Sequence, residues 1–561
     1  MPDENSTRPM RRALILPTRK APGTAGRTGA VRATLEQKFK IGRGVLEWLL
    51  FALLSVARFA ASGLVYYPQL DDYIQYYKYT ALCTPAEAVI KYGMLAARPL
   101  SNAADVFVWA KFWPCLFAAV VIISLLYAAS AIMFRHVFAA LFPSLFEGGG
   151  TAFLLLYLLL PLNIEGTYWL SASTRVVCGL FWTSLSAMLF IRWLEGKRAG
   201  CAVLYALTQL LAMASYEQAL TLVAALTALI AAVYYRRSGR RVLLALTLLS
   251  NGIIYWVFIS QFRDTSPLYA SAYGMVLPFS AHFWRVHLPH VLQQFTAAFV
   301  GGGVLILFKG ALRGIVLVFR EGKAVYFLVT LLCAGLTSAL LLRPDKSRDR
   351  PLQTAGPAKL AGSLAAGVFL AAAPLLPHVI KENPWFSLRG TVSSLPGIAL
   401  CVEALLANLL LRIGRRLGTG QALRRVAAGA GGLFVALCFF ATASELDDYR
   451  LTYENDQAVM AAVAEVIDLE DARGRIALVG VLPCYLSDQN FFYHEHIHGV
   501  TESDWALSGA LFAYSGGLLD PSARFVPLTG DAAQRLLLGE TEGFDQIYIY
   551  ADGKFVRADI N

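Results

Sequence analysis

Residues 66–77 read YYPQLDDYIQYY, and this stretch follows directly on a long apolar run at residues 45–65. Because about 20 apolar residues cross a bilayer, the run predicts a membrane span that opens onto two adjacent carboxylates, Asp71 and Asp72. Two carboxylates held close together raise each other's pKa, so that one can act as a base while the other binds a cation or a sugar hydroxyl. The stretch is therefore a candidate for chemistry at a membrane surface.

The composition is that of a polytopic membrane protein. The chain has 561 residues, of which 57% are hydrophobic and 16% are charged, and its mean hydropathy is +0.53. The hydrophobic share is higher, and the charged share lower, than in ordinary soluble domains. Apolar runs long enough to cross a bilayer lie at twelve places: 45–65, 112–134, 148–163, 175–194, 201–215, 218–235, 242–260, 288–308, 324–342, 361–380, 391–411 and 427–443. We expect an α-helical protein with 11 to 13 spans.

The net charge of +11 is distributed unevenly along the chain. Residues 444–561 contain twenty acidic and seven basic residues, a net charge of −13, so the rest of the chain carries +24. Much of the basic excess lies in short loops between apolar runs, which makes nucleic acid a poor explanation for it. Basic side chains in such loops are Arg192, Lys197, Arg198, Arg236, Arg237, Arg240, Arg241, Arg412, Arg415, Arg416, Arg424 and Arg425.

Short basic loops of membrane proteins face the cytoplasm, and this rule orients the chain. Residues 1–43 are basic, rich in Pro, Gly and Thr and without apolar periodicity, which predicts a disordered cytoplasmic tail. Residues 44–443 are then the transmembrane domain, and residues 444–561 an extracytoplasmic domain. We expect a multi-pass protein of the plasma or inner membrane.

The same rule places several polar segments on the outer face: 66–111, 163–175, 261–290 and 378–390, together with the turn near Glu217. They contain the residues that we predict to be functional: Asp71, Asp72, Tyr73, Arg98, Glu165, Trp169, Arg175, Glu217 and Arg389. Three alternatives without a catalytic role stay open. The aromatic residues can be a membrane-interface belt, Glu217 can be a turn residue that touches water, and Lys381 and Arg389 can extend to the interface as long basic side chains do.

The topology conflicts with the charge rule in one region. Two crossings within residues 288–342 would put the basic stretch at 343–350 outside. Either residues 288–342 contain a re-entrant segment or one crossing is missing from the twelve runs. The mixed apolar and aromatic pattern of residues 261–290 predicts an amphipathic helix along the membrane surface.

The C-terminal part predicts a small α/β domain. Residues 457–470 favour a helix, 475–481 a buried strand, and 546–558 a hairpin around Ala551-Asp552-Gly553. Neither a G-x-G-x-x-G motif nor a Walker loop is present in this domain.

Metal binding is a weaker alternative within that domain. His494, His496 and His498 would point to one face of a strand, as a zinc or manganese site could require. The eight cysteines are scattered, and only Cys83 and Cys484 fall in predicted outer segments, so no disulfide framework is predicted.

Several of these features together resemble a known superfamily. They are Asp71-Asp72 just after the first span, Arg98-Pro99-Leu100 later in the same loop, the core of many spans, and an extracytoplasmic C-terminal domain. The layout resembles the GT-C superfamily of integral membrane glycosyltransferases, whose donors are polyprenyl-phosphate sugars. It is also similar to the GtrII-like glucosyltransferases that decorate surface polysaccharide. The resemblance covers residues 44 to 443.

The resemblance implies roles for individual residues. An aspartate of the first outer loop is the catalytic carboxylate in that superfamily, acting as a base or helping to hold a divalent metal, so Asp71 or Asp72 takes this role. The arginine that binds the lipid phosphate corresponds to Arg389, Arg98 or Arg175, in that order. No separated D-x-D occurs at Asp71, so dependence on Mg²⁺ or Mn²⁺ stays open.

The predicted function is therefore transfer of a hexose from a polyprenyl-phosphate donor to a glycan, lipid or protein acceptor of the cell envelope. Membrane lipid is an implied partner and nucleic acid is not. One alternative is a polysaccharide polymerase or ligase that uses a lipid-linked glycan. A second is a transporter or flippase for lipid-linked sugars, which would favour an internal repeat, and the sequence contains none between its halves.

Overall fold

The structure is a computed structural model that describes residues 43–91, 98–146, 149–196, 198–262, 274–343, 356–417, 420–481, 499–538 and 543–558. The chain forms two compact units, Met1–Glu47 and Trp48–Asn561. The first described helix is α2 (Arg43–Ala60). All the contacts described below lie within the second unit.

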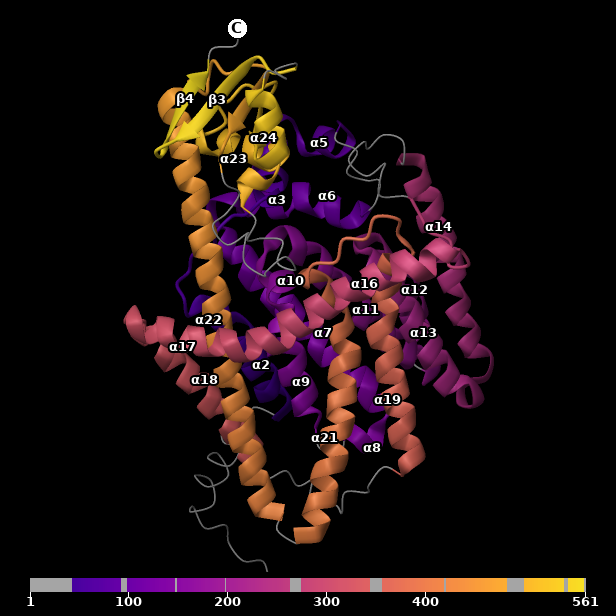
Figure 1. Cartoon of the computed structure of the whole chain (residues 1–561). Coiled ribbons are helices and arrows are strands. Elements are labelled where there is room, and N and C mark those ends of the chain that lie inside the picture. Colours follow the sequence, from indigo (N-terminus) through magenta and orange to yellow (C-terminus); the bar gives the residue numbers. More distant parts are fainter. Residues whose placement is uncertain are drawn as a thin grey trace, which may run out of the picture. The chain divides into compact units, whose positions relative to one another are not determined.

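Helices form the core of this unit (Figure 1). They are α7 (Leu116–Leu141), α9 (Thr151–Leu159), α11 (Leu170–Leu194), α12 (Gly200–Ser215), α13 (Glu217–Ser238), α14 (Thr247–Phe262), α18 (Ala324–Leu342), α19 (Pro357–Ala372), α21 (Leu395–Leu417) and α22 (Gly420–Val466). Shorter turns of helix connect them: η2 (Trp109–Cys115), α8 (Pro143–Phe146), η3 (Pro161–Asn163), α10 (Glu165–Tyr168), η4 (Gly239–Leu246), η9 (Ala373–Leu375), α20 (Leu376–Ile380) and η10 (Leu388–Ser394).

Eight helices among the described residues are long and apolar enough to cross a membrane. The expectation of a helical membrane protein is confirmed in this form, whereas the count of 11 to 13 spans stays a prediction. One of the eight, Glu217–Gln261, contains a reversal. Gln209 of α12 is hydrogen-bonded both to Thr227 of α13 (3.4 Å) and to Asn251 of α14 (2.9 Å), so the chain must turn back between these two residues.

The first predicted outer loop is folded into short helices. They are α3 (Asp71–Tyr73), η1 (Ile74–Lys78), α4 (Tyr79–Leu82), α5 (Pro85–Lys91) and α6 (Pro99–Phe107). Arg58, near the end of α2, is buried and donates to Asn163 Oδ1 (2.6 Å) and Thr167 Oγ1 (2.8 Å). Because a buried guanidinium needs hydrogen-bond partners, these bonds fix η3 and α10 against the first helix.

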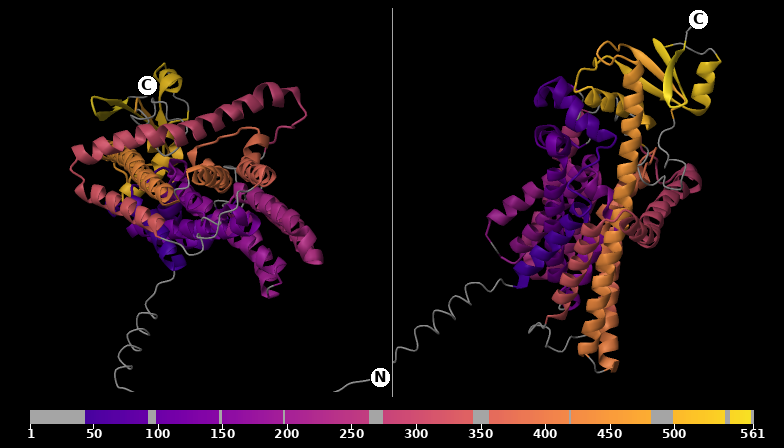
Figure 2. Two further views of the ribbon diagram at one scale, coloured as in Figure 1. Left: turned by 90° about the horizontal axis from the view of Figure 1, so that it is seen from below. Right: turned by 90° about the vertical axis from the view of Figure 1, so that its left-hand side faces the viewer.

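A further long helix runs across several of the others (Figure 1; Figure 2, left). It consists of η7 (Phe283–His287), α16 (Leu288–Thr296), η8 (Ala297–Gly310) and α17 (Ala311–Arg320). The surface helix expected at 261–290 overlaps its first turns, and residues 263–273 lie outside the described residues.

The C-terminal part contains a four-stranded sheet of order β2-β1-β3-β4. Its elements are β1 (Arg475–Val479), η12 (Val500–Glu502), α23 (Asp504–Tyr514), β2 (Arg524–Leu528), α24 (Gly530–Leu537), β3 (Gln546–Ala551) and β4 (Lys554–Ala558). β1 pairs in parallel with β2 and β3, while β3 and β4 form an antiparallel hairpin. The hairpin turns at Asp552 and Gly553, whose positive φ angles of 51° and 80° suit the Asp-Gly pair.

The long helix α22 crosses the predicted boundary at residue 444 without a break. The separate helix expected at 457–470 is its last part, and α22 ends at Val466. The residues proposed for metal binding, His494, His496 and His498, lie outside the described residues, as does Cys484.

Candidate active site

Asp72 is a fully buried carboxylate whose oxygens accept three hydrogen bonds. Oδ2 accepts hydrogen bonds from the Tyr66 hydroxyl (2.6 Å) and the backbone amide of Gln69 (3.0 Å), and Oδ1 accepts one from the backbone amide of Ser171 (3.0 Å). Burial raises the pKa of Asp72 to about 7, although these three donors act in the opposite direction. Asp72 therefore ties the first predicted outer loop to the N-terminal turn of α11.

The chain turns sharply just before the acidic pair. Leu70 has a φ of 40°, in the left-handed region that residues other than glycine rarely adopt. This turn lets the Asp72 amide donate to the Gln69 carbonyl (2.8 Å) while the Asp72 carboxylate accepts from the Gln69 amide. Asp71 opens α3 and is partly exposed, in contrast to Asp72. The two adjacent carboxylates thus occupy different environments.

The C-terminal part of the chain packs against the segment that carries the acidic pair. A Cβ atom added at Gly509 of α23 would lie 2.6 Å from Cγ1 of Ile74. The rings of Tyr77 and Phe512 lie 5.9 Å apart, and Tyr73, which is buried, packs edge-on against Trp113 at 6.0 Å. Side chains from both parts of the chain therefore hold α3 and η1.

Arg175 is buried beside Asp105 of the first predicted outer loop. A guanidinium nitrogen of Arg175 lies 3.5 Å from Asp105 Oδ2, and the hydroxyls of Thr174 and Tyr76 lie 2.8 and 3.4 Å from Asp105 Oδ1. Burial raises the pKa of Asp105 to about 6, against the effect of Arg175. This pair connects α6 to α11.

Glu165, Trp169 and Arg389 lie together. The backbone amide of Arg389 donates to Glu165 Oε1 (3.3 Å), and the Arg389 guanidinium lies 5.2 Å from the centre of the Trp169 ring, within cation–π distance. Glu165 and Trp169 are fully buried, whereas Arg389 is partly exposed. The predicted outer segments 163–175 and 378–390 therefore meet at these residues.

Arg98 and Glu217 form a bidentate ion pair. The guanidinium donates from Nε to Oε2 (2.7 Å) and from Nη2 to Oε1 (2.6 Å), and it lies 4.7 Å from the centre of the Tyr216 ring. The Glu217 side chain is 38% exposed, so the pair reaches solvent. Glu217, at the turn between α12 and α13, is thus paired with a residue of the first predicted outer loop.

Gln218 joins this ion pair to the Arg389 segment. Its side-chain amide lies 3.1 Å from His378 Nε2 and donates to the Gly390 carbonyl (3.0 Å). Lys381 interacts electrostatically with the same charged residues, Glu217, Arg98 and Arg389, and burial lowers the pKa of Lys381. Arg98 and Lys381, from two predicted outer loops, therefore both interact with the Glu217 carboxylate, and Arg389 interacts with Lys381.

A continuous set of contacts thus links most of the predicted site residues. It runs from Asp72 through residues 165–171 to Arg389, and on through Gln218 to Glu217 and Arg98. Arg175 and Tyr73 are buried. Sequence reasoning had not selected Tyr66, Asp105, Gln218, His378 and Lys381. Tyr66 was nonetheless the first residue of the stretch 66–77, and His378 and Lys381 lie within the predicted loop 378–390.

No group of three or more His, Cys, Asp or Glu side chains that could hold a metal ion occurs among the described residues. The residues proposed to hold a divalent metal, Asp71 and Asp72, contribute one carboxylate each. The two oxygens of the Asp72 carboxylate accept three hydrogen bonds.

Comparisons with known proteins do not show a family for this chain. No family model matches it, and no curated protein matches it. Among solved structures, the chain is similar to ArnT from Cupriavidus metallidurans bound to undecaprenyl phosphate. The similarity covers 91% of this chain and 97% of ArnT, with 13% sequence identity and a TM-score of 0.38. These values are too low to carry a function from one protein to the other.

Proposed function

We propose that this protein is a membrane glycosyltransferase of GT-C type. It transfers a hexose from a polyprenyl-phosphate donor to a glycan, lipid or protein acceptor on the extracytoplasmic face of the membrane. The observation that carries the proposal is the meeting of carboxylates and cations from predicted outer segments far apart in the sequence. Arg98 pairs with Glu217, and the backbone amide of Arg389 donates to Glu165. Glu217 and Arg389 lie at the starts of two apolar helices.

Asp71 is the better candidate for the catalytic base. A base must reach the acceptor hydroxyl, and Asp71 is partly exposed, whereas Asp72 is fully buried. Both oxygens of Asp72 also accept hydrogen bonds from Tyr66, Gln69 and Ser171. Asp72 is therefore assigned a positioning role: it holds the turn from which Asp71 projects.

The cations Arg98, Lys381 and Arg389 are suited to a lipid-linked phosphate. Guanidinium groups bind phosphate oxygens through charge-assisted hydrogen bonds, and both arginines are partly exposed. Glu217 interacts with Arg98 and Lys381 and reduces the net charge of this group. Arg98 makes a bidentate pair with Glu217, and we assign first contact with the donor to Arg389 and Lys381, which belong to one predicted outer segment.

The proposed reaction is a single displacement. The Asp71 carboxylate takes the proton of the acceptor hydroxyl, and the acceptor oxygen forms a bond to the anomeric carbon of the sugar. The bond between that carbon and the phosphate oxygen breaks, and its electron pair leaves with the polyprenyl phosphate. Arg389 and Lys381 stabilise the negative charge on the departing phosphate.

The test is to purify the full-length protein with Asp71→Asn or Asp72→Asn and to measure sugar transfer from a polyprenyl-phosphate hexose. We expect Asp71→Asn to keep the melting temperature of the parent and to lose about 10²- to 10⁴-fold in rate, the usual contribution of a general base. Asp72→Asn should lower the melting temperature, because the amide nitrogen cannot accept a hydrogen bond from Ser171, Gln69 or Tyr66. Asp552→Asn, in the exposed hairpin turn, is the matched control.

The donor is tested in the same assay. Arg389→Ala should weaken donor binding by roughly ten- to a hundredfold, the loss expected for a hydrogen bond to a charged group, and Arg557→Ala on the exposed face of β4 should not. Full activity of both aspartate variants would refute the assignment of the base. Movement of the lipid-linked sugar across a vesicle membrane without turnover would refute the enzyme and favour a transporter.

A further inference from the structure

The helix that runs from Phe283 to Arg320 has both of its ends at the same side of the helical core. Near its start, the His287 imidazole is hydrogen-bonded to the carbonyl oxygen of Val379 (3.0 Å), at the end of α20. Just after its end, a carboxylate oxygen of Glu321 lies 4.0 Å from the guanidinium of Arg450. Val379 and Arg450 both belong to segments that the charge rule assigns to the outer face.

The middle of this helix contacts the same side. The Gln294 side chain accepts a hydrogen bond from the Phe386 amide (2.9 Å) and donates to the Pro384 carbonyl (3.1 Å). A Cβ atom at Gly303 would lie 3.1 Å from the side chain of Leu162, close to Glu165 in the sequence. The helix therefore passes beside the segments that carry Glu165 and Arg389.

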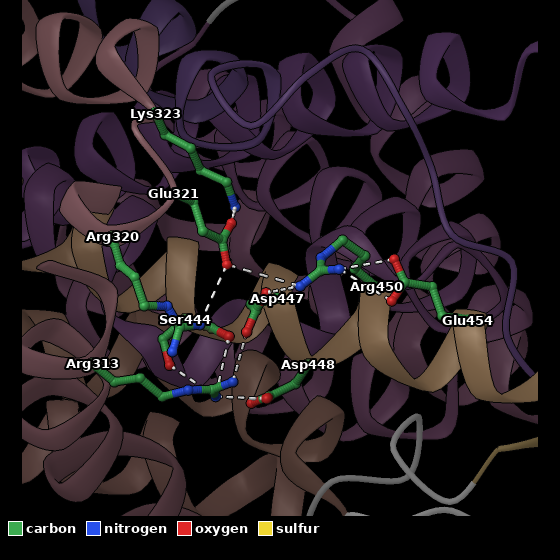
Figure 3. A network of polar contacts seen from close by, with 9 residues as sticks. All are labelled: Arg313, Arg320, Glu321, Lys323, Ser444, Asp447, Asp448, Arg450 and Glu454. Atoms are coloured by element: carbon green, nitrogen blue, oxygen red, sulfur yellow. Dashed lines mark hydrogen bonds and ion pairs between the residues drawn. The ribbon is translucent and has the colours of Figure 1, made fainter. Parts of the chain in front are cut away.

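Its C-terminal part is fixed to α22 by ion pairs and by close packing. The Arg313 guanidinium donates to Asp448 Oδ1 (2.6 Å) and to Asp447 Oδ2 (2.8 Å), as Figure 3 shows. A side chain at Gly314 would collide with the backbone carbonyl of Phe440. These contacts hold the helix just where the apolar run of α22, residues 427–443, ends.

The helix is also longer than a perpendicular membrane crossing requires. At a rise of about 1.5 Å per residue, 38 residues extend about 57 Å, more than the hydrocarbon core of a bilayer. The next helix, α18, does leave this side. It follows α22 from Tyr326, which is hydrogen-bonded to the carbonyl of Phe439, to Ser338, which donates to Ala428.

The outward surface of the helix has the character of a lipid contact. Exposed apolar side chains occur along its whole length, among them Trp284, Val286, Val304, Phe308, Leu312 and Val316. The helix contains no acidic residue and four basic ones. Arg313 is paired with α22, whereas Arg285, Lys309 and Arg320 are exposed. Apolar side chains mixed with basic ones favour binding to a surface of anionic phospholipid.

We propose that the helix from Phe283 to Arg320 lies in the plane of the outer membrane interface and binds phospholipid there, rather than crossing the bilayer. Of the twelve apolar runs, eleven then cross. α18 then ends at the cytoplasmic side. The charge rule assigns the basic stretch that begins at Arg343 to this side. The helix fixes the depth of Glu165 and Arg389 relative to the headgroups of the lipid.

Depth-dependent fluorescence quenching tests this proposal independently of any reaction. The full chain, with its native cysteines replaced by serine, receives single cysteines at Val286, Val304 and Val316, which are exposed. Each is labelled with bimane in vesicles of phosphatidylcholine and phosphatidylglycerol whose acyl chains carry bromine near the headgroup or near the chain end. Val325, Leu332 and Leu342, exposed on the crossing helix α18, form the matched series.

We expect all three labels on the Phe283–Arg320 helix to be quenched by the shallow bromines and to lie within about 10 Å of the headgroup boundary. The label at Leu332 should instead be quenched best by the deep bromines. A label at Val304 as deep as that at Leu332 would show a crossing helix and overturn the proposal, and so would the absence of quenching at all three positions. Leu292 and Phe308 serve as replacement positions if a variant does not fold.

Discussion

At the scale of single residues, adjacent carboxylates differ because their backbones place them differently. The turn at Leu70 sends the Asp72 side chain inward, toward the Gln69 and Ser171 amides, and leaves Asp71 at the start of α3. Tyr66 donates to Asp72 and also accepts a hydrogen bond from the Leu170 amide (2.9 Å). The tyrosine that opens the stretch 66–77 is therefore part of the support for its carboxylates.

The pH dependence of stability follows from the burial of Asp72. Its pKa of about 7 in the folded chain exceeds the ordinary value of 3.8, so the folded protein binds a proton more tightly than the unfolded one. The resulting stabilisation is complete below pH 3.8 and is lost as the pH rises through about 7. We expect the melting temperature to fall between pH 5 and pH 8, and Asp72→Asn to reduce this slope. An equal slope in both proteins would contradict the assignment.

At the scale of elements, helix α23 supports the segment that carries the acidic pair. Gly509 allows α23 to approach Ile74 so closely that a Cβ atom would lie 2.6 Å from it. A larger residue there must push α3 and η1 away from α23, because the Cγ1 atom of Ile74 sits next to the backbone and has little room to move.

We therefore expect Gly509→Ala to destabilise the protein by about 1–3 kcal/mol, the usual cost of overpacking. It should also lower the rate of sugar transfer without changing donor affinity, because Asp71 would shift while the cations stay in place. Steady-state kinetics and thermal unfolding measure these two effects. Gly335→Ala in α18, where a Cβ atom meets open space, is the control. Reduced stability with an unchanged rate would show that α23 does not position Asp71.

At the scale of the whole molecule, the contacts divide the predicted loops into two groups. The predicted outer segments contact one another through Asp72 and Ser171, and through Gln218 and Gly390. The predicted cytoplasmic loops also contact one another, since the Trp193 side chain donates to the Arg241 carbonyl (3.2 Å).

We expect this division to correspond to the two sides of the membrane. In intact cells, a membrane-impermeant maleimide should label a cysteine at Asp552, which is exposed in the β3–β4 turn, in a background without native cysteines. It should label a cysteine at Arg240, which is exposed in η4, only after the membrane is permeabilised. Labelling of both positions in intact cells, or of Arg240 alone, would contradict the orientation.

The sequence by itself determined the class of protein and the grouping of its polar segments. Apolar runs of spanning length and basic loops act locally, because the cost of burying a charge in lipid depends on the residue and not on its distant neighbours. That is why candidates such as Glu165, Glu217 and Arg389 could be selected before any contact was known.

Only the tertiary structure decided which of these residues meet and which are exposed. The pairing of Arg98 with Glu217, 119 residues apart, and the burial of Asp72 and Arg175 depend on how the helices pack. The course of the Phe283–Arg320 helix depends on packing in the same way. Its apolar composition suits a crossing or an interfacial position equally, and only its contacts with Val379 at one end and Asp448 near the other distinguish the two.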